Sequence, residues 1–270
     1  MRRARGVTGA VRPWQGSGVD DPSNPRRIVE VLAPYVSEAR RARIEAILDA
    51  RTRDVVVVLE DVVNDHNGAA VMRTADAMGL QELHLVPNEA GFRVSRKVAR
   101  GAHKWVDARH HRSAPEAYRH LRASGYRVWA SSVHGATVPV AEVPREGKVA
   151  LVFGNEREGV SRAALEQADG RFHVPMHGFV ESLNISVAAA LALSAVVGGR
   201  RAAGRITPLA PDDRAELAAR WYQRSVRAAE ELLARAGLSP VPDPSEDVVI
   251  ETEGRYGARV LPGPAEVRGG

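Results

Sequence analysis

The sequence predicts an α/β fold with a parallel sheet, and two features carry that prediction. Short apolar segments typical of strands alternate along the chain with longer segments typical of helices, which is the pattern of parallel α/β folds. The uninterrupted run at residues 55–59 consists of four β-branched valines and a leucine. Such runs are typical of strands that are buried on both faces of a parallel sheet.

The remaining elements follow in order from capping residues, periodicity and breaks. Ser37 can cap an amphipathic, basic helix that contains Ile44 and Leu48, and the first buried strand follows at residues 54–59. A helix is expected at about residues 68–78, and Asp212 can cap a last helix to about residue 236. Between them we expect strands at residues 82–86, 126–131, 149–153 and 171–174, and helices at 114–123, 161–167 and 184–197.

Composition excludes several classes of protein. The chain has 270 residues, 44% of them hydrophobic, which suffices for a globular core. It has no cysteine, so disulfide scaffolds, cysteine-ligated zinc and thiol catalysis are excluded. No apolar run approaches the roughly 20 residues that span a bilayer, and the N-terminus lacks a hydrophobic signal segment. We therefore expect no membrane partner and a cytoplasmic location.

Charge is unevenly distributed, and this suggests how the chain is divided. The net charge of +5 combines +5 in residues 1–53, zero in 54–197, +3 in 198–238 and −3 in 239–270. We expect a flexible basic leader at residues 1–33 and a folded domain at 34–205 that begins with the basic helix. A helical extension would follow at residues 206–238, and an acidic, proline-rich tail without fixed structure at 239–270.

Three polar segments each follow a predicted strand, where open α/β sheets bind their ligands. The first contains Asn67 and Arg73, the second contains Gly154 and Glu156, and the third runs from Val174 to Ser186. A purely structural role is the alternative for each segment, since asparagine and serine cap helices and arginine is often a solvated helix charge. No glycine-rich dinucleotide motif, phosphate loop or nucleophile elbow is present. His103, His110 and His111 have no recognised metal-binding spacing, so we expect no metal.

Together the three segments resemble a known family. The blocks Asn-x-x-Asn…Arg-Thr-Ala, Phe-Gly-x-Glu-x-x-Gly-Val and Pro-Met-x-Gly…Ser-Leu-Asn-x-Ser-Val-Ala occur in this order between about Pro34 and Arg205. They are similar to those of the SpoU class of SPOUT methyltransferases, and most of all to the TrmH family of tRNA guanosine-2′-O-methyltransferases. The resemblance implies a SPOUT fold with a C-terminal deep trefoil knot, flanked by basic helices. It also implies a homodimer with S-adenosylmethionine as cofactor.

The resemblance also implies roles for individual residues. Arg73 would be catalytic, supported by Asn67, Glu156, Ser182 and Asn184. The cofactor would lie against loops that contain Ser132, Gly154, Met176, Leu183 and Ile185. A guanidinium normally stays protonated, so Arg73 would more readily hold a phosphate or stabilise a developing alkoxide than remove a proton. Whether Arg73 acts as a base is left open.

RNA requires a basic footprint, and the neutral centre of the chain supplies none in net terms. The expected contacts are Arg40, Arg43, His66, Lys104, Arg200, Arg201 and Arg224. Their alternative role is that of solubilising surface charges. We expect tRNA as substrate, because 33 residues before Pro34 are too few for a folded recognition domain. The alternatives are a ribosomal RNA 2′-O-methyltransferase and, in a different class, a knot-fold RNA-binding protein without catalytic activity.

Overall fold

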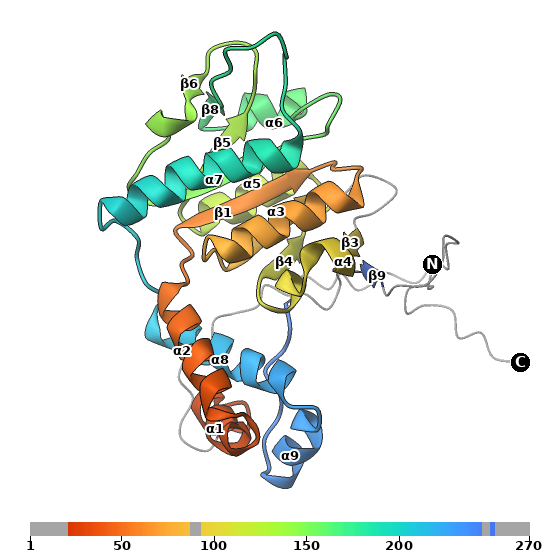
Figure 1. Cartoon of the computed structure of the whole chain (residues 1–270), viewed down its shortest axis with the longest axis vertical. Coiled ribbons are helices and arrows are strands. Elements are labelled where there is room, and N and C mark those ends of the chain that lie inside the picture. Colours follow the sequence, from red (N-terminus) through yellow and green to blue (C-terminus); the bar gives the residue numbers. More distant parts are fainter. Residues whose placement is uncertain (1–20, 87–92, 245–248, 252–270) are drawn as a thin grey trace, which may run out of the picture.

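The computed structural model describes residues 21–86, 93–244 and 249–251, and it contains a sheet unit with a helical unit below it (Figure 1). The strands of the main sheet are β1 (Val55–Glu60), β2 (Glu82–Val86), β4 (Asp107–His110), β5 (Tyr126–Ser131), β6 (Val138–Pro139), β7 (Lys148–Phe153) and β8 (Gly170–His173). They are all parallel, in the order β4-β2-β1-β7-β5-β8-β6. The predicted α/β fold with a parallel sheet is confirmed.

Helices cover both faces of the sheet. The helices are α3 (Asp65–Ala77), α5 (Ala114–Ala123), α6 (Arg162–Gln167) and α7 (Ile185–Ala202). Val55, Val57 and Leu59 of β1 share one core with α3 and α7, whereas Val56 and Val58 share the other core with α5 and α6. This alternation explains why the central strand is apolar at every position.

The longest helix lies within one of these cores. By length and composition α7 could cross a bilayer, with 18 residues and a mean hydropathy of 1.3. Its residues Ala189, Leu193 and Val197 are fully buried with α3 and the sheet. Core helices of water-soluble proteins have the same length and apolarity, so we assign α7 to the core of the sheet unit.

The helical unit is assembled from the two ends of the described chain. It comprises α1 (Pro25–Leu32), the 3₁₀ turn η1 (Ala33–Tyr35), α2 (Glu38–Ala50), α8 (Pro211–Ser225) and α9 (Ala229–Arg235). Its core contains Ile28 and Leu32 of α1, Leu48 of α2, Trp221 of α8 and Leu233 of α9. The two flanking helices predicted from the sequence, α2 and α8, pack side by side (Figure 1).

Buried charges join the helical unit to the sheet unit. Arg220 of α8 donates two hydrogen bonds to Asp107 of β4, at 2.7 and 3.1 Å, and both side chains are almost fully buried. Arg53 also reaches Asp107, at 3.1 Å, and it pairs with Glu82 of β2. Since buried ions with one partner removed are costly, this network fixes how the two units sit together.

Two expectations for the chain ends need correction. The leader without fold was expected to reach residue 33, but α1 occupies Pro25–Leu32 and buries Ile28 and Leu32. The sequence pattern of α1 is too short to stand out, because the helix has only eight residues, from Pro25 after the capping residue Asn24. Residues 1–20 lie outside the described residues.

The predicted last helix is two helices, because Val226 is extended and separates α8 from α9. The tail is also partly ordered. Leu238 and Val241 are buried in the helical core, and Gln223 exchanges two hydrogen bonds with the backbone of Val241. Farther on, β9 (Val249–Glu251) pairs in parallel with β3 (Arg93–Ser95). Residues 252–270 lie outside the described residues.

Candidate active site

Loops at the carboxyl ends of β5, β7 and β8 enclose a cavity of about 420 Å³. All five residues expected to hold a cofactor line it, namely Ser132, Gly154, Met176, Leu183 and Ile185. Two of the residues expected to be catalytic, Glu156 and Ser182, line it as well. The structure thus brings the second and third sequence blocks together around one cavity.

The loop after β7 can close on itself only with glycine at position 154. A Cβ atom built there would lie 2.2 Å from the carbonyl carbon of Gly159 and from the amide of Val160. Asn155 forms an antiparallel bridge with Gly159, and its side-chain oxygen accepts a hydrogen bond of 2.8 Å from the amide of Arg157. The absence of a Cβ atom at Gly154 therefore allows the two sides of the loop to approach each other closely.

A chain of hydrogen bonds connects all three sequence blocks. The Asn67 side-chain amide donates to Glu156 Oε1 at 2.8 Å, and the Asn184 side-chain amide donates to Asn67 Oδ1 at 3.1 Å. Asn184 also caps α7, since its Oδ1 accepts from the amide of Ser186 at 2.9 Å. Asn64, not Asn67, provides the side-chain cap of α3. Asn67 is therefore free to link Glu156 with Asn184.

These hydrogen bonds also determine the charge state of Glu156. Burial alone would raise the pKa of its carboxyl group, but hydrogen bonds from the Asn67 side chain and from the amides of Glu156, Val63 and Asn64 outweigh that effect. The net result is a pKa below the usual glutamate value. Glu156 is accordingly a carboxylate at neutral pH and acts as an acceptor.

The end of β1 anchors the β7 loop through two residues that the sequence analysis did not single out. Buried Glu60 accepts hydrogen bonds from the amide and the hydroxyl of Ser161, at 3.0 and 2.7 Å. Asp61 has a left-handed backbone, with φ of 53°, and its carbonyl oxygen accepts from the side chain of Asn155 at 3.0 Å. The sequence signal that could have identified Glu60 and Asp61 is their position, as two acidic residues directly after the apolar run at residues 55–59.

Arg73 lies apart from this chain of hydrogen bonds. It is exposed on α3, six residues after Asn67. At 1.5 Å and 100° per residue it is displaced by about 9 Å along the helix and about 120° around it. Its guanidinium is thus presented to solvent and to any incoming molecule, and its predicted catalytic role stays a prediction.

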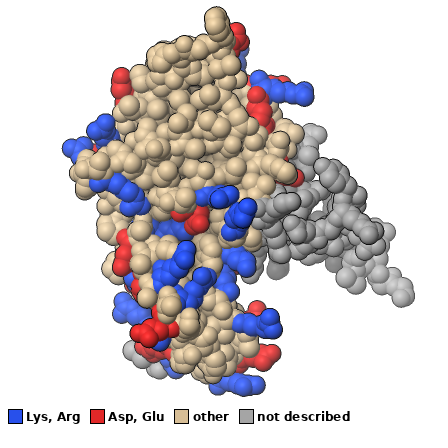
Figure 2. All heavy atoms as spheres, viewed as in Figure 1, with Lys and Arg blue, Asp and Glu red and all other residues tan. Residues whose placement is uncertain are grey.

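Four of the expected RNA contacts are accessible. Arg40, Arg43, His66 and Lys104 are all exposed. The guanidinium of Arg40 lies 5.0 Å from the ring centre of Trp105, which gives this arginine a fixed platform. Figure 2 shows Lys and Arg side chains gathered over the lower half of the face, on the helical unit and its junction with the sheet unit.

Arg200 was expected to contact RNA, but it is fully buried. Its guanidinium donates to the carbonyl oxygens of Gly147 at 2.8 Å and Pro144 at 2.6 Å, and burial lowers its pKa. It holds the segment before β7 onto α7 and cannot reach a phosphate in this structure. The expected RNA contact of Arg200 is therefore wrong, because its guanidinium is buried and donates to backbone carbonyls.

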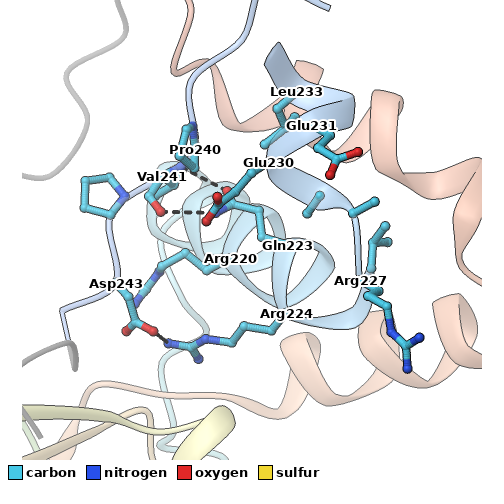
Figure 3. A pocket seen from close by; sticks show the side chains of 14 residues that line it. Arg220, Gln223, Arg224, Arg227, Glu230, Glu231, Leu233, Pro240, Val241 and Asp243 are labelled. Carbon is cyan, nitrogen blue, oxygen red and sulfur yellow. Dashed lines mark hydrogen bonds and ion pairs between the residues drawn. The ribbon is translucent and has the colours of Figure 1, made fainter. Parts of the chain in front are cut away.

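Arg224 and Arg201 also have structural partners. Arg224 pairs with Asp243 and donates to the carbonyl of Lys104, beside a cavity of about 480 Å³ between α8, α9 and residues 240–243 (Figure 3). Arg224 is thereby tied to the helical unit, and its predicted RNA contact stays a prediction. Arg201 is exposed, yet it donates to the carbonyls of Ala50 at 2.8 Å and Met78 at 3.2 Å.

A histidine cluster lies under α5, away from the cavity. Ligand atoms of Glu82, His84 and His120 lie within 4.8 Å of one another. Arg53 and Arg109 both pair with Glu82, so the site carries no net negative charge to attract a divalent cation. The expectation of no metal stays a prediction.

The comparisons with known proteins agree with this geometry. The SpoU rRNA Methylase family model matches residues 54–194. The tRNA (guanosine(18)-2′-O)-methyltransferase of Thermus thermophilus is 43% identical over 58% of this chain and 81% of its own, and the Escherichia coli enzyme of the same name is 31% identical over 83% and 97%. The crystal structure of the Aquifex aeolicus TrmH/SpoU tRNA modifying enzyme has a TM-score of 0.65 at 29% identity, and covers 70% of this chain and 98% of that one. The chain belongs to the SpoU family of RNA 2′-O-methyltransferases.

Proposed function

We propose that this protein is a tRNA (guanosine(18)-2′-O)-methyltransferase that uses S-adenosylmethionine. The observation that carries the proposal is the convergence of the cavity with the hydrogen-bonded chain Glu156–Asn67–Asn184. Relatives that are 31–43% identical over most of their own length carry this activity in their names, which supports tRNA over ribosomal RNA as substrate.

The cavity suits S-adenosylmethionine in size and lining. Its volume of about 420 Å³ lies in the range usual for small-molecule sites. Phe153, Met176, Leu183 and Ile185 offer apolar contacts, while the loop around Gly154 places backbone groups at the wall. We infer that these loops hold the cofactor, with Ser132 at the end of β5.

The chemistry requires alignment more than covalent help from the protein. The cofactor supplies a methyl group on a sulfonium, which a ribose 2′-oxygen displaces in line. The protein must therefore position that oxygen, receive its proton and stabilise the developing charge. We assign positioning to Asn67, Ser182 and Asn184, acceptance of hydrogen bonds to Glu156, and charge stabilisation or phosphate binding to Arg73.

A homodimer belongs to the same proposal. The face of α7 turned away from the core is apolar or small, with Val187 and Leu191 each 46% exposed and Ser194 and Gly198 continuing the stripe. A second copy that covers this stripe would lie next to α3, which packs against α7 and carries Arg73. A residue from one protomer could then serve the site of its partner.

We also propose the deep trefoil knot and a cytoplasmic location. Support for the knot comes from the strand order. The last strand of the sheet along the chain, β8, lies between β5 and β6, which both precede it in the sequence. The tRNA footprint would consist of Arg40, Arg43, His66 and Lys104, which are exposed, with Arg201 at its edge.

Mass mapping of nucleosides tests the substrate. The enzyme is incubated with S-adenosylmethionine and either unmodified tRNA or ribosomal RNA, and the products are sequenced as fragments. We expect 2′-O-methylguanosine in the tRNA D-loop only. Methylation confined to ribosomal RNA would favour the runner-up, and cofactor binding without any transfer would favour a non-catalytic RNA-binding protein.

A further inference from the structure

The tip of the loop between β8 and α7 carries the most exposed large apolar side chain among the described residues. Phe179 has a relative exposure of 108%, and its neighbour Val180 has one of 62%. Leaving a phenylalanine in water forgoes the favourable free energy that burial of its ring would bring. A side chain held out in this way is available to a binding partner.

The loop geometry places this tip at the rim of the candidate active site. Met176, on one side of the tip, lines the 420 Å³ cavity, and so do Ser182 and Leu183 on the other side. The next residue, Asn184, donates its hydrogen bond to Asn67. The loop is the teal segment that leads into α7 at the upper end of the molecule in Figure 1. Phe179 therefore stands beside the cavity mouth and not on a remote surface.

The charges at this rim do not favour a phosphate contact. Arg157 and His177 are exposed there, but so are the carboxylates of Glu156, Glu158 and Glu181. Because acidic groups outnumber the one permanent cation among these residues, the sugar–phosphate backbone would not be drawn to the tip. The contact that this tip can offer to RNA is apolar and aromatic.

Resting on the proposed function, we propose that Phe179 stacks on an unpaired tRNA nucleobase presented together with the acceptor ribose. The 2′-oxygen has to reach the cavity between the loops, which separates its nucleotide from its neighbours in the RNA. Bases freed in this way commonly stack on aromatic side chains in RNA-binding proteins. Stacking needs a flat aromatic face, and it is not satisfied by an aliphatic side chain of similar size.

Three substitutions at this position separate stacking from other roles. Phe179→Ala and Phe179→Leu should each weaken tRNA binding and raise the KM for tRNA by roughly 5- to 150-fold, the usual range for loss of one stacked base. Phe179→Trp should bind like the wild type, and its added indole fluorescence should be quenched by tRNA. Full tRNA affinity in the alanine variant, or in the leucine variant alone, would overturn the proposal.

Control measurements separate RNA stacking from other roles of Phe179, namely cofactor binding and a subunit interface. Tyr35→Ala removes another exposed aromatic ring, 59% exposed and on the helical unit near the phosphate footprint, and it should weaken tRNA binding much less than Phe179→Ala. Calorimetry with S-adenosylmethionine should give the same affinity for the Phe179 variants as for the wild type, and sedimentation should give the same mass. A dimer that dissociates in Phe179→Ala would place the ring in a subunit interface and overturn the proposal.

The two failures are distinguishable. A wild-type protein that neither binds nor methylates tRNA overturns the proposed function and this inference with it. A wild-type protein that methylates tRNA while Phe179→Ala does so with unchanged KM overturns only the role of Phe179.

Discussion

At the scale of single residues, the account depends on what Arg73 does. Its guanidinium is exposed on α3. The hydrogen-bonded chain Glu156–Asn67–Asn184 fixes the geometry beside the cavity but contains no cation. In our proposal Arg73, from the first sequence block, supplies the cation that holds a phosphate or stabilises the developing alkoxide.

We predict that Arg73→Ala abolishes methyl transfer and leaves folding and S-adenosylmethionine affinity nearly unchanged, since Arg73 does not line the cavity. Arg73→Lys should also fail, because lysine retains the charge but loses the planar fork of donors. Steady-state kinetics with tRNA, together with calorimetry for the cofactor, measures both. Substantial activity in the lysine variant would show that charge alone is sufficient.

Gly154 gives a second prediction at this scale. Gly154→Ala places a methyl group against the backbone of Gly159 and Val160, so the β7 loop has to open. We expect S-adenosylmethionine affinity to fall at least about 10-fold, with a smaller effect on the melting temperature. Gly178→Ala is the matched control, because a Cβ atom there meets nothing within 4 Å. Equal cofactor affinity in both variants would mean that the loop is not part of the binding wall.

The motif residues could be predicted from sequence because their types and order are specific to the family. The structural partners of Arg200 and Arg224 could not be predicted, since these carbonyls and this carboxylate lie far away along the chain. An arginine in a basic helix gives the same sequence signal whether it contacts phosphate or caps a neighbouring segment. Only the packing of α7 and α8 against other elements separates the two roles.

At the scale of elements, the edge of the sheet contains a pair of histidines in contact with each other. His84 of β2 is buried, and its Nδ1 lies 2.8 Å from Nε2 of His111, which follows β4. Burial is the largest cause that lowers the pKa of His84, to about 3, and of His111, to about 4. Strand β4, which precedes His111, could not be predicted from sequence, because Asp107 and Arg109 interrupt its apolar pattern. Their ion-pair partners, Arg220 and Glu82, come close only in the folded protein.

These shifts predict acid destabilisation. Because the folded-state pKa values lie below the unfolded value near 6.5, the unfolded chain binds more protons once the pH falls below about 6.5. The stability present above that pH is lost as the pH approaches the folded values, by about 2 kcal/mol at pH 5 for His84. Urea unfolding at pH 7.5 and 5 measures the loss, and His84→Asn should reduce the difference between the two. An unchanged difference in the variant would contradict the assignment.

The exposed face of α7 predicts an interface between subunits. Leu191→Glu should dissociate the proposed dimer, since a charge on the apolar stripe is costly to bury. Because Leu191 is 46% exposed, the fold of the monomer should survive. Sedimentation velocity distinguishes the two masses. A wild-type protein that is already monomeric at micromolar concentration would contradict the proposed homodimer.

At the scale of the whole molecule, α1, α2, α8 and α9 form one unit that is locked to the sheet unit. Five of the seven strands of the sheet could be predicted from sequence, because their apolar patterns reflect their burial, whereas β4 and β6 could not. The helical unit could not, because its core joins residues from α1 and α9 that lie about 200 positions apart. Its exposed arginines are thereby held at a fixed distance from the candidate active site.

We predict that Arg40 and Arg43 serve RNA and that Arg200 serves the fold. Replacing Arg40 and Arg43 with alanine should weaken tRNA binding and flatten its salt dependence, with cofactor affinity unchanged. Arg200→Ala should instead lower the free energy of unfolding by about 1–3 kcal/mol, because it leaves the carbonyls of Pro144 and Gly147 without their donor. An unchanged salt slope in the double variant would contradict the footprint.

The most direct test of the central claim uses one atom of the substrate. Two tRNA transcripts are prepared that differ only at the D-loop acceptor guanosine, which carries a 2′-hydroxyl in one and a 2′-deoxyribose in the other. Transfer of labelled methyl from S-adenosylmethionine is then counted per transcript. We predict about one methyl group on the first transcript and none on the second, because the 2′-oxygen is the nucleophile. Equal transfer to both transcripts would contradict the assignment of this protein as a 2′-O-methyltransferase of that nucleotide.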